Sequence, residues 1–206
     1  TPLFLMLAGR YFDRTGDRET IAAIWPNIEA ALLWIDEYGE QDKDGFCEYY
    51  RETDSGLANQ GWKDSHDAIS HQDGSTAQGS IALCEVQGYV YAAKHAVARM
   101  AAELGHRDLT TKLFEEAERL RLRFDEAFWC EEIGTYALAL DGAKRPCRVR
   151  ASNAGHALFS GIAEPERAER VAAALMSPAS FSGWGIRTLA KGEARYNPMS
   201  YHNGSV

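Results

Sequence analysis

The chain alternates between segments whose apolar residues recur at helical spacing and polar segments with no such period. Residues 3–13 form a short apolar run that ends before Gly16, and residues 18–38 place an apolar side chain at every third or fourth position. Pro26 lies inside the second segment, so we expect either a kinked helix or a new first turn there. A third helix is predicted over about 78–104.

The second half of the chain continues the helical pattern and interrupts it once. Asp108 can cap a fourth helix, which carries its own apolar face. Residues 134–150 look extended, with a turn at Asp141-Gly142, and this predicts a small β-hairpin. Two shorter helices are expected at about 153–162 and 165–176.

The predicted architecture is all-α, with helix pairs joined by alternately short and long connections. The long connections hold most of the unusual residues: 40–77, 129–152 and 177–206. If the helix pairs stack side by side into an arc, these loops gather on one face and build a site there. An (α/α)6 toroid has this arrangement. The predicted helices would supply about half of such a barrel, so we treat residues 1–206 as one partial domain.

Composition and charge indicate which classes of binding partner are compatible with the chain. The chain has 206 residues, 45% apolar content and a formal charge of −8, which is typical of an acidic globular domain with a core. This balance argues against nucleic acid as a partner, because no basic patch offsets phosphate repulsion. The sequence also argues against a membrane, since no apolar run approaches the ~20 residues of a spanning helix.

The cysteines do not form a metal-binding pattern. They stand without a CxxC pair at Cys47, Cys84, Cys130 and Cys147, and the histidines are scattered, so we expect no zinc. Asp42-Lys43-Asp44-Gly45 superficially matches a calcium loop but lacks the later ligands and closing Glu, which favours a solvated turn. We predict no metal and no cofactor. A disulfide framework is unnecessary at this size, which favours a reducing, cytoplasmic compartment.

The most informative stretch is Asn59-Gln60-Gly61-Trp62-Lys63-Asp64-Ser65-His66-Asp67, in the first long loop. It places an indole two residues before a carboxylate, with a second carboxylate three residues further on. Carbohydrate enzymes use this pairing, because a flat apolar ring stacks on a sugar face and a nearby acid protonates the glycosidic oxygen. Taken alone, the same residues also fit a tryptophan that fills the core and aspartates that cap turns.

Four further segments follow in an order that resembles a known family. Trp62-Lys63-Asp64 resembles the Trp-x-acid element of the glucoamylase-type six-hairpin glycosidases, and the chain is most similar to bacterial amylo-α-1,6-glucosidase or glycogen-debranching-like enzymes. The matching segments run through Ile81–Tyr91, Ser152–Leu158, Ser182–Thr188 and Tyr196–Val206. The resemblance covers essentially the whole chain, and it implies the toroid fold and a glycosidase in carbohydrate metabolism.

The resemblance also implies roles for individual residues. Asp64 corresponds to the general acid, and a carboxyl beside an indole and away from water would stay protonated near neutrality. The residues expected to contact the sugar are Trp62, Asp67, Glu85, Gln87, Asn153, His156, Trp184, Arg187, Tyr201, His202 and Asn203. Each has a structural alternative, such as core packing, a turn or helix cap, or a surface ion pair.

The family pattern contains elements that this sequence lacks. Its last motif continues into Trp-Pro, and its catalytic base is a carboxylate well after the His-Asn-Gly segment, with no corresponding position here. We therefore expect the base to lie beyond Val206 and the isolated 206-residue piece to be inactive. We also expect that piece to pair with another copy of itself or with a missing C-terminal half.

The leading function is inverting hydrolysis of an α-glucosidic bond in an α-glucan or oligosaccharide. One alternative is a sugar epimerase on the same kind of toroid, with His156 and His202 as the candidate acid and base. The other is a non-catalytic carbohydrate-binding or scaffold fragment, because only one carboxylate of the pair can be placed. The partner in the leading interpretation is a carbohydrate substrate.

Overall fold

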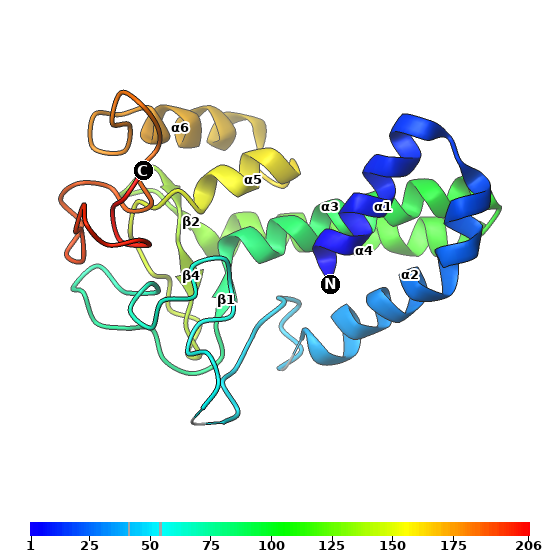
Figure 1. Cartoon of the computed structure of the whole chain (residues 1–206), viewed down its shortest axis with the longest axis horizontal. Helices are drawn as coiled ribbons and strands as arrows, with labels where there is room; N and C mark the ends of the chain where they lie inside the picture. The colour runs from blue at the N-terminus through cyan, green and yellow to red at the C-terminus, as the bar shows by residue number, and fades with distance from the viewer. Residues whose placement is uncertain (41, 54) are drawn as a thin grey trace.

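The computed structural model describes residues 1–40, 42–53 and 55–206, and within these ranges it is mostly helical (Figure 1). Its helices are α1 (Pro2–Thr15), α2 (Arg18–Tyr38), α3 (Cys84–Leu104), α4 (Arg107–Phe128), α5 (Ala154–Ser160) and α6 (Pro165–Leu175). Its strands have two residues each: β1 (Ala82–Leu83), β2 (Trp129–Cys130), β3 (Thr135–Tyr136) and β4 (Ala139–Leu140). The prediction of a helical fold with a minor β component is confirmed.

The ends of the helices follow from local chemistry. Asp17 caps α2, because its side chain accepts a hydrogen bond from the backbone N–H of Thr20 at 2.9 Å. α1 and α3 end at Gly16 and Gly105, whose φ angles of 64° and 87° lie in the left-handed region that favours glycine. Pro26 lies inside α2, which continues through it, so no new helix begins there.

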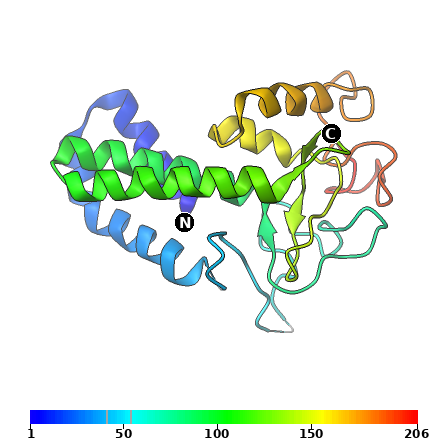
Figure 2. The same cartoon turned by 180° about the vertical axis from the view of Figure 1, so that it is seen from behind.

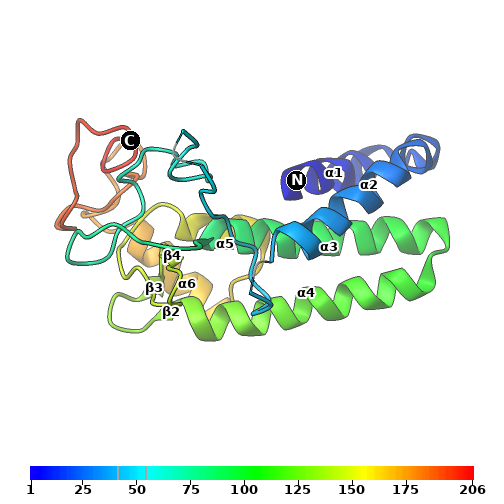
Figure 3. The same ribbon diagram turned by 90° about the horizontal axis from the view of Figure 1, so that it is seen from below.

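Successive helices of the described chain form three hairpins: α1–α2, α3–α4 and α5–α6. α3 is the central helix. It packs along α4 within its own hairpin and also contacts α1 and α5, the first helices of the other two (Figure 3). Repetition of such hairpins builds a six-hairpin toroid, and three of them amount to the expected half.

The helix predicted from residue 78 begins later, at Cys84. The preceding residues are extended instead: Ile81 bridges to Tyr49, and Ala82 of β1 lies opposite Leu140 of the antiparallel β4. A short apolar run carries no periodicity that separates a strand from a helix, which explains the error. The pairing joins the first and second long loops at the start of α3.

The extended segment at 134–150 forms the predicted hairpin and also pairs with β1 and β2. The predicted turn at Asp141-Gly142 is present, since Leu140 bridges Pro146 across it. The residues before this turn belong to a separate hairpin, in which β3 is antiparallel to β2.

The long loops gather at one end of the molecule, as predicted. Figures 1 and 2 show the loop after α2, the strands and the segment after α6 together at that end, away from the turns that close the α1–α2 and α3–α4 hairpins. A small apolar cluster lies beneath these loops: Ala68, Ile69, Ile81, Leu83, Leu138, Ala139, Cys147, Val149, Ala151 and Leu189. Because it draws residues from all three loops, this cluster fixes them relative to one another.

The larger apolar cluster lies among the helices and includes three of the four cysteines, Cys47, Cys84 and Cys130. All four cysteines are buried and free. Across the residues that the structure describes, no helix combines the length and apolar character needed to cross a membrane. The cytoplasmic location stays a prediction.

One face of α1 predicts association. Leu3, Leu7 and Tyr11 recur at helical spacing with exposed side chains, and Leu7 is 68% exposed. A contiguous apolar face of this kind is seldom left uncovered in a monomer. We expect the isolated 206-residue chain to self-associate, and the double substitution Leu3→Glu, Leu7→Glu to shift it towards monomer, as measured by sedimentation equilibrium.

A charge reversal elsewhere serves as the control. Glu115→Lys changes an exposed position on α4 and should leave the association unchanged. A wild-type chain that is monomeric at high micromolar concentration would contradict the prediction.

Candidate active site

The acid loop, defined here as residues 59–67, is held by a buried asparagine. The side-chain amide of Asn59 donates to the backbone oxygen of Ser65 at 2.6 Å, and its carbonyl accepts from the hydroxyl of Tyr49 at 2.8 Å. The backbone N–H of Ala68 also donates to the Ser65 backbone oxygen. These bonds fix both ends of the loop independently of any substrate.

Trp62 lies at the surface of this loop between two histidines from distant segments. The residue is 42% exposed, and its ring centroid lies 5.6 Å from that of His202 and 6.1 Å from that of His156. The sequence alternatives were a sugar platform and a core plug. A half-exposed indole flanked by polar rings fits the platform and does not fit the plug.

Asp64 lies next to the same histidine but remains largely open to solvent. Its side chain is 56% exposed, and its Oδ1 is 3.8 Å from Nδ1 of the buried His202. That nitrogen also lies 2.8 Å from Ser65 Oγ, and burial lowers the pKa of His202. The described residues therefore do not provide the dry surroundings expected for a protonated acid.

Asp67 and Asn203 join the acid loop to the last segment of the chain. The Asn203 side-chain amide donates to Oδ2 of Asp67 at 3.0 Å, and a guanidinium nitrogen of Arg195 lies 3.7 Å from the same oxygen. Asn203 itself is buried. The bond makes Asp67 a tether between the two segments, which fits its structural alternative.

Two fully buried polar side chains meet at the start of α3. Glu85 accepts a hydrogen bond from the amide of Asn153 at 2.9 Å through Oε2, while its Oε1 has no hydrogen-bond partner among the described residues. Burial raises the pKa of Glu85, and the bond from Asn153 opposes that shift. Two of the predicted sugar-binding residues thus come together from distant segments, at the start of α3 and directly before α5.

Sequence reasoning did not identify Lys63, which is 1% exposed. Its ammonium donates to the backbone oxygen of Thr188 and lies 5.2 Å from the centroid of the Trp62 ring. Burial lowers the pKa of Lys63 to about 7, although Glu85 opposes the shift. A lysine in a polar loop looks solvated, and only its place between Trp62 and Asp64 could have drawn attention to it.

Tyr89 was also missed and positions a predicted residue. Its hydroxyl lies 2.6 Å from Nδ1 of His156, and burial raises the pKa of the phenol to about 12. Burial likewise lowers the pKa of His156. The Tyr89 side chain leaves α3 one turn after Glu85, so a search for residues four apart on that helix would have found it.

The other predicted residues are less closely associated with the acid loop. The Gln87 amide is fully engaged with the backbone of Cys47, donating to its oxygen at 2.7 Å and accepting from its N–H at 2.9 Å. Tyr201 is exposed but packs its ring 4.3 Å from that of His202. Trp184 is 96% exposed, and Nη1 of Arg187 is buried with no hydrogen-bond partner among the described residues.

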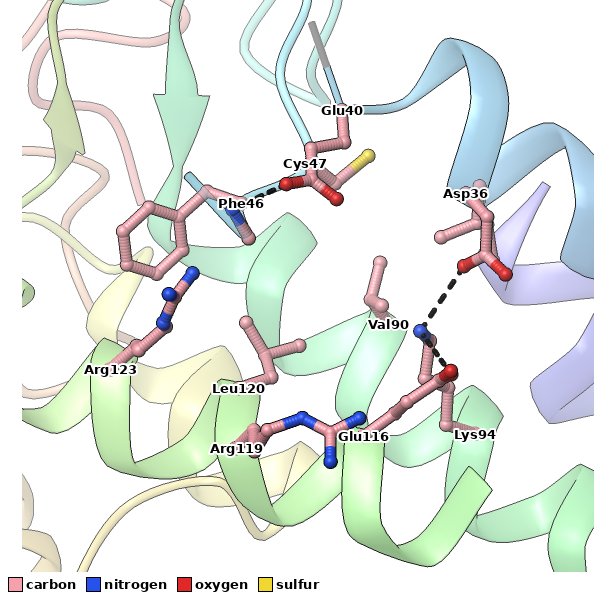
Figure 4. A pocket seen from close by; sticks show the side chains of 12 residues that line it. Asp36, Glu40, Phe46, Cys47, Val90, Lys94, Glu116, Arg119, Leu120 and Arg123 are labelled. Atoms are coloured by element: carbon pink, nitrogen blue, oxygen red, sulfur yellow. Dashed lines mark hydrogen bonds and ion pairs between the residues drawn. The ribbon is translucent and has the colours of Figure 1, made fainter. Parts of the chain in front are cut away.

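A cavity of about 330 Å³ lies elsewhere, between α2, α3 and α4 (Figure 4). At its wall the Lys94 ammonium binds the carboxylates of Asp36 and Glu116, at 3.2 Å and 2.8 Å. None of the predicted sugar-binding residues lines this cavity. It is therefore separate from the candidate site.

The comparison with protein families decides the class of the chain. The model of the mannosylglycerate hydrolase MGH1-like glycoside hydrolase domain matches residues 1–206. The chain belongs to this family. The expectation of a six-hairpin glycosidase is confirmed, and the narrower amylo-α-1,6-glucosidase activity is not established by this match. No curated protein matches the sequence.

Solved structures support the same fold. The MGH1-like domain superposes on a glycoside hydrolase family 63 mannosylglycerate hydrolase from Thermus thermophilus, in complex with Tris and D-glycerate, with a TM-score of 0.72 and 15% identity. The match covers 100% of this chain and 61% of that one. An uncharacterized conserved protein from the same organism gives a TM-score of 0.73 and 16% identity, over 100% and 60%.

A sialidase gives a TM-score of 0.77 at 14% identity, covering 98% of this chain and 18% of that one. The MGH1-like domain therefore spans about three fifths or less of these relatives. At such identities the likeness establishes the fold alone.

The loop Asp42-Lys43-Asp44-Gly45 takes part in an ion cluster of the MGH1-like domain. Among the residues that the structure describes, Asp42, Asp44 and Glu48 could together hold a metal ion, with ligand atoms within 4.8 Å of one another. Lys144 binds all three carboxylates, with distances of 2.8 Å to Asp42 and 2.6 Å to Asp44. The domain thus supplies its own cation, and the predicted absence of a metal stays a prediction.

Removal of Lys144 should destabilise the domain. Glu48 is buried and one of its oxygens has no partner among the described residues, so Lys144→Met would leave a buried carboxylate without its cation. We expect a loss of about 2–3 kcal/mol in the free energy of unfolding, measured by urea denaturation in EDTA.

Lys43→Met is the matched control. Lys43 is an exposed neighbour in the same loop, and its substitution should change stability by less than about 0.5 kcal/mol. Equal effects of the two substitutions would refute the role assigned to the cluster.

Proposed function

We propose that the full-length protein hydrolyses an α-glycosidic bond with inversion of configuration, and that Asp64 is its general acid. The observation that carries the proposal is that the half-exposed Trp62 ring and the open Asp64 carboxylate both lie next to the buried His202. The ring offers an apolar face to a sugar, and the carboxyl lies beside it. Membership of a glycoside hydrolase family supports the same chemistry.

The exposure of Asp64 requires further protein around it. A general acid must stay protonated near neutrality, and exclusion of water is what raises its pKa. The chain covers 61% of the related mannosylglycerate hydrolase, and we propose that the rest of the full-length protein closes over Asp64. The same part would supply the base, because inversion needs a second carboxylate roughly 6.5–9.5 Å from the acid.

Two substrate classes are compatible with this site. The sequence resemblance favours α-glucosides, including α-1,6-linked glucans. A glycoside whose aglycone carries a carboxylate, such as mannosylglycerate, is favoured by the match to the mannosylglycerate hydrolase MGH1-like family. Assays of the full-length protein with maltose, isomaltose, aryl α-glucosides and mannosylglycerate would separate the two.

The epimerase alternative has less support. It relies on His156 and His202, whose Nδ1 atoms are bonded to Tyr89 and Ser65, so that Nε2 of each ring would have to exchange the proton. The matching family model is that of a glycoside hydrolase instead. The non-catalytic alternative predicts binding without turnover in the full-length protein. The same substrate assays test it.

The acid assignment predicts a loss of turnover in Asp64→Asn. The amide cannot donate the proton that the leaving group needs, so kcat should fall on the order of 100- to 10,000-fold while the affinity for glucose persists. The measurement is steady-state hydrolysis by the full-length protein.

Asp67→Asn is the matched control for the acid. It removes a carboxylate from the same loop, and we expect a smaller fall in kcat because Asp67 is tied to Asn203. A greater loss in the Asp67 variant would move the acid to that residue, and wild-type turnover in Asp64→Asn would remove the assignment altogether.

The platform role predicts weaker binding in Trp62→Ala. Loss of stacking should reduce the affinity of the full-length protein for glucose by about 1 kcal/mol or more, as measured by calorimetry. Trp34 on α2 has the same exposed fraction, 42%, and lies outside the loops. Trp34→Ala should therefore bind glucose normally, and a similar loss in both variants would contradict the role.

A further inference from the structure

Lys63 is the one residue of the Trp62-Lys63-Asp64 element that points into the protein. Its side chain is almost fully buried, whereas both of its neighbours are exposed. Lysine is rarely buried so completely unless its ammonium is paired. Here the ammonium donates to the backbone oxygen of Thr188, and its charge lies over the Trp62 ring.

Thr188 is a junction of the three long loops. Its backbone oxygen also accepts from the N–H of Ser152, and its own N–H donates to the backbone oxygen of Ser205. The bond from Lys63 therefore ties the acid loop to the segments before α5 and after α6. Loss of this bond would free the backbone of the acid loop, which carries both Trp62 and Asp64.

We propose that Lys63 is a positioning residue of the glycosidase site, whose buried ammonium holds Trp62 and Asp64 in place by binding the Thr188 backbone oxygen. This inference rests on the proposed function. The charged form of Lys63 is required, because a charge-assisted hydrogen bond is stronger than a neutral one and only the cation is attracted to the indole face.

The ionisable groups that face Lys63 include Glu85, His156 and His202. Glu85 on α3 favours the charged lysine, while burial disfavours it and brings its pKa to about 7. His156 on α5 and His202 in the last segment also face Lys63, and burial lowers the pKa of both below the ordinary 6.5. Loss of the lysine proton is thus the event expected near pH 7.

Stability and binding should respond to this event in opposite directions. Because the folded-state pKa lies below the ordinary 10.5 of lysine, the unfolded chain binds more protons between pH 7 and 10.5. The contribution of Lys63 to the free energy of unfolding therefore rises with pH in that window. Binding at Trp62 should weaken over the same range, so general alkaline unfolding would not explain the loss.

The test uses the full-length protein carrying Asp64→Asn, so that the acid does not contribute to the titration. We expect the dissociation constant for glucose to increase roughly 3- to 10-fold as pH rises through about 7, with a parallel change in tryptophan fluorescence. Adding Lys63→Met should abolish the transition and leave the weak, high-pH affinity at every pH. Adding Lys191→Met, an exposed lysine in the last segment, should leave the transition intact.

A second variant covers the case in which Lys63→Met does not fold. Glu85→Gln keeps the shape of the side chain and removes the charge that favours protonated Lys63, so the midpoint should move to lower pH. An unchanged midpoint in this variant, or a persistent transition in Lys63→Met, overturns the proposal. Turnover by Asp64→Asn alone would instead remove the acid assignment, which keeps the two failures distinguishable.

Discussion

The arrangement of the long loops depends on one requirement. Their buried polar groups must find hydrogen-bond partners where the loops pack on the helices. The first turns of α3 meet it. The Gln87 amide binds both backbone groups of Cys47, Glu85 accepts from Asn153, and the Tyr89 hydroxyl binds a histidine on α5. Since these side chains leave one helix, segments from two different loops are held in register against a single rigid element.

The same end of the molecule also contains deeply buried charges. Glu85 and Lys63 are each 1% exposed, and each favours the charged form of the other. Glu48 is buried against Lys144 in a second such group. Burying ions is unfavourable even when they are paired, and apolar side chains at these positions would avoid that penalty. Perturbed ionisable groups beside a half-exposed indole are typical of functional sites.

Much of the fold could be predicted because it follows from local periodicity. The helices, the capping glycines and the loop end of the molecule all have signals in the sequence. The prediction that Asp108 caps α4 is wrong, because the helix begins at Arg107 and Asp108 lies in its first turn without a side-chain cap. The errors arose where tertiary contacts decide. Residues 81–83 are extended because they pair with Tyr49 and with β4. Neither partner is adjacent in the sequence.

The Trp62-Lys63-Asp64 element combines both kinds of information. Trp62 and Asp64 are exposed, whereas Lys63 between them is buried and its ammonium is bonded to the Thr188 backbone oxygen. The two outer residues could be recognised from their chemistry. The inner one was hidden because lysine is expected at the surface. Because Lys63 lies between Trp62 and Asp64 in the chain and is bonded to Thr188, a shift of its backbone would shift both neighbours.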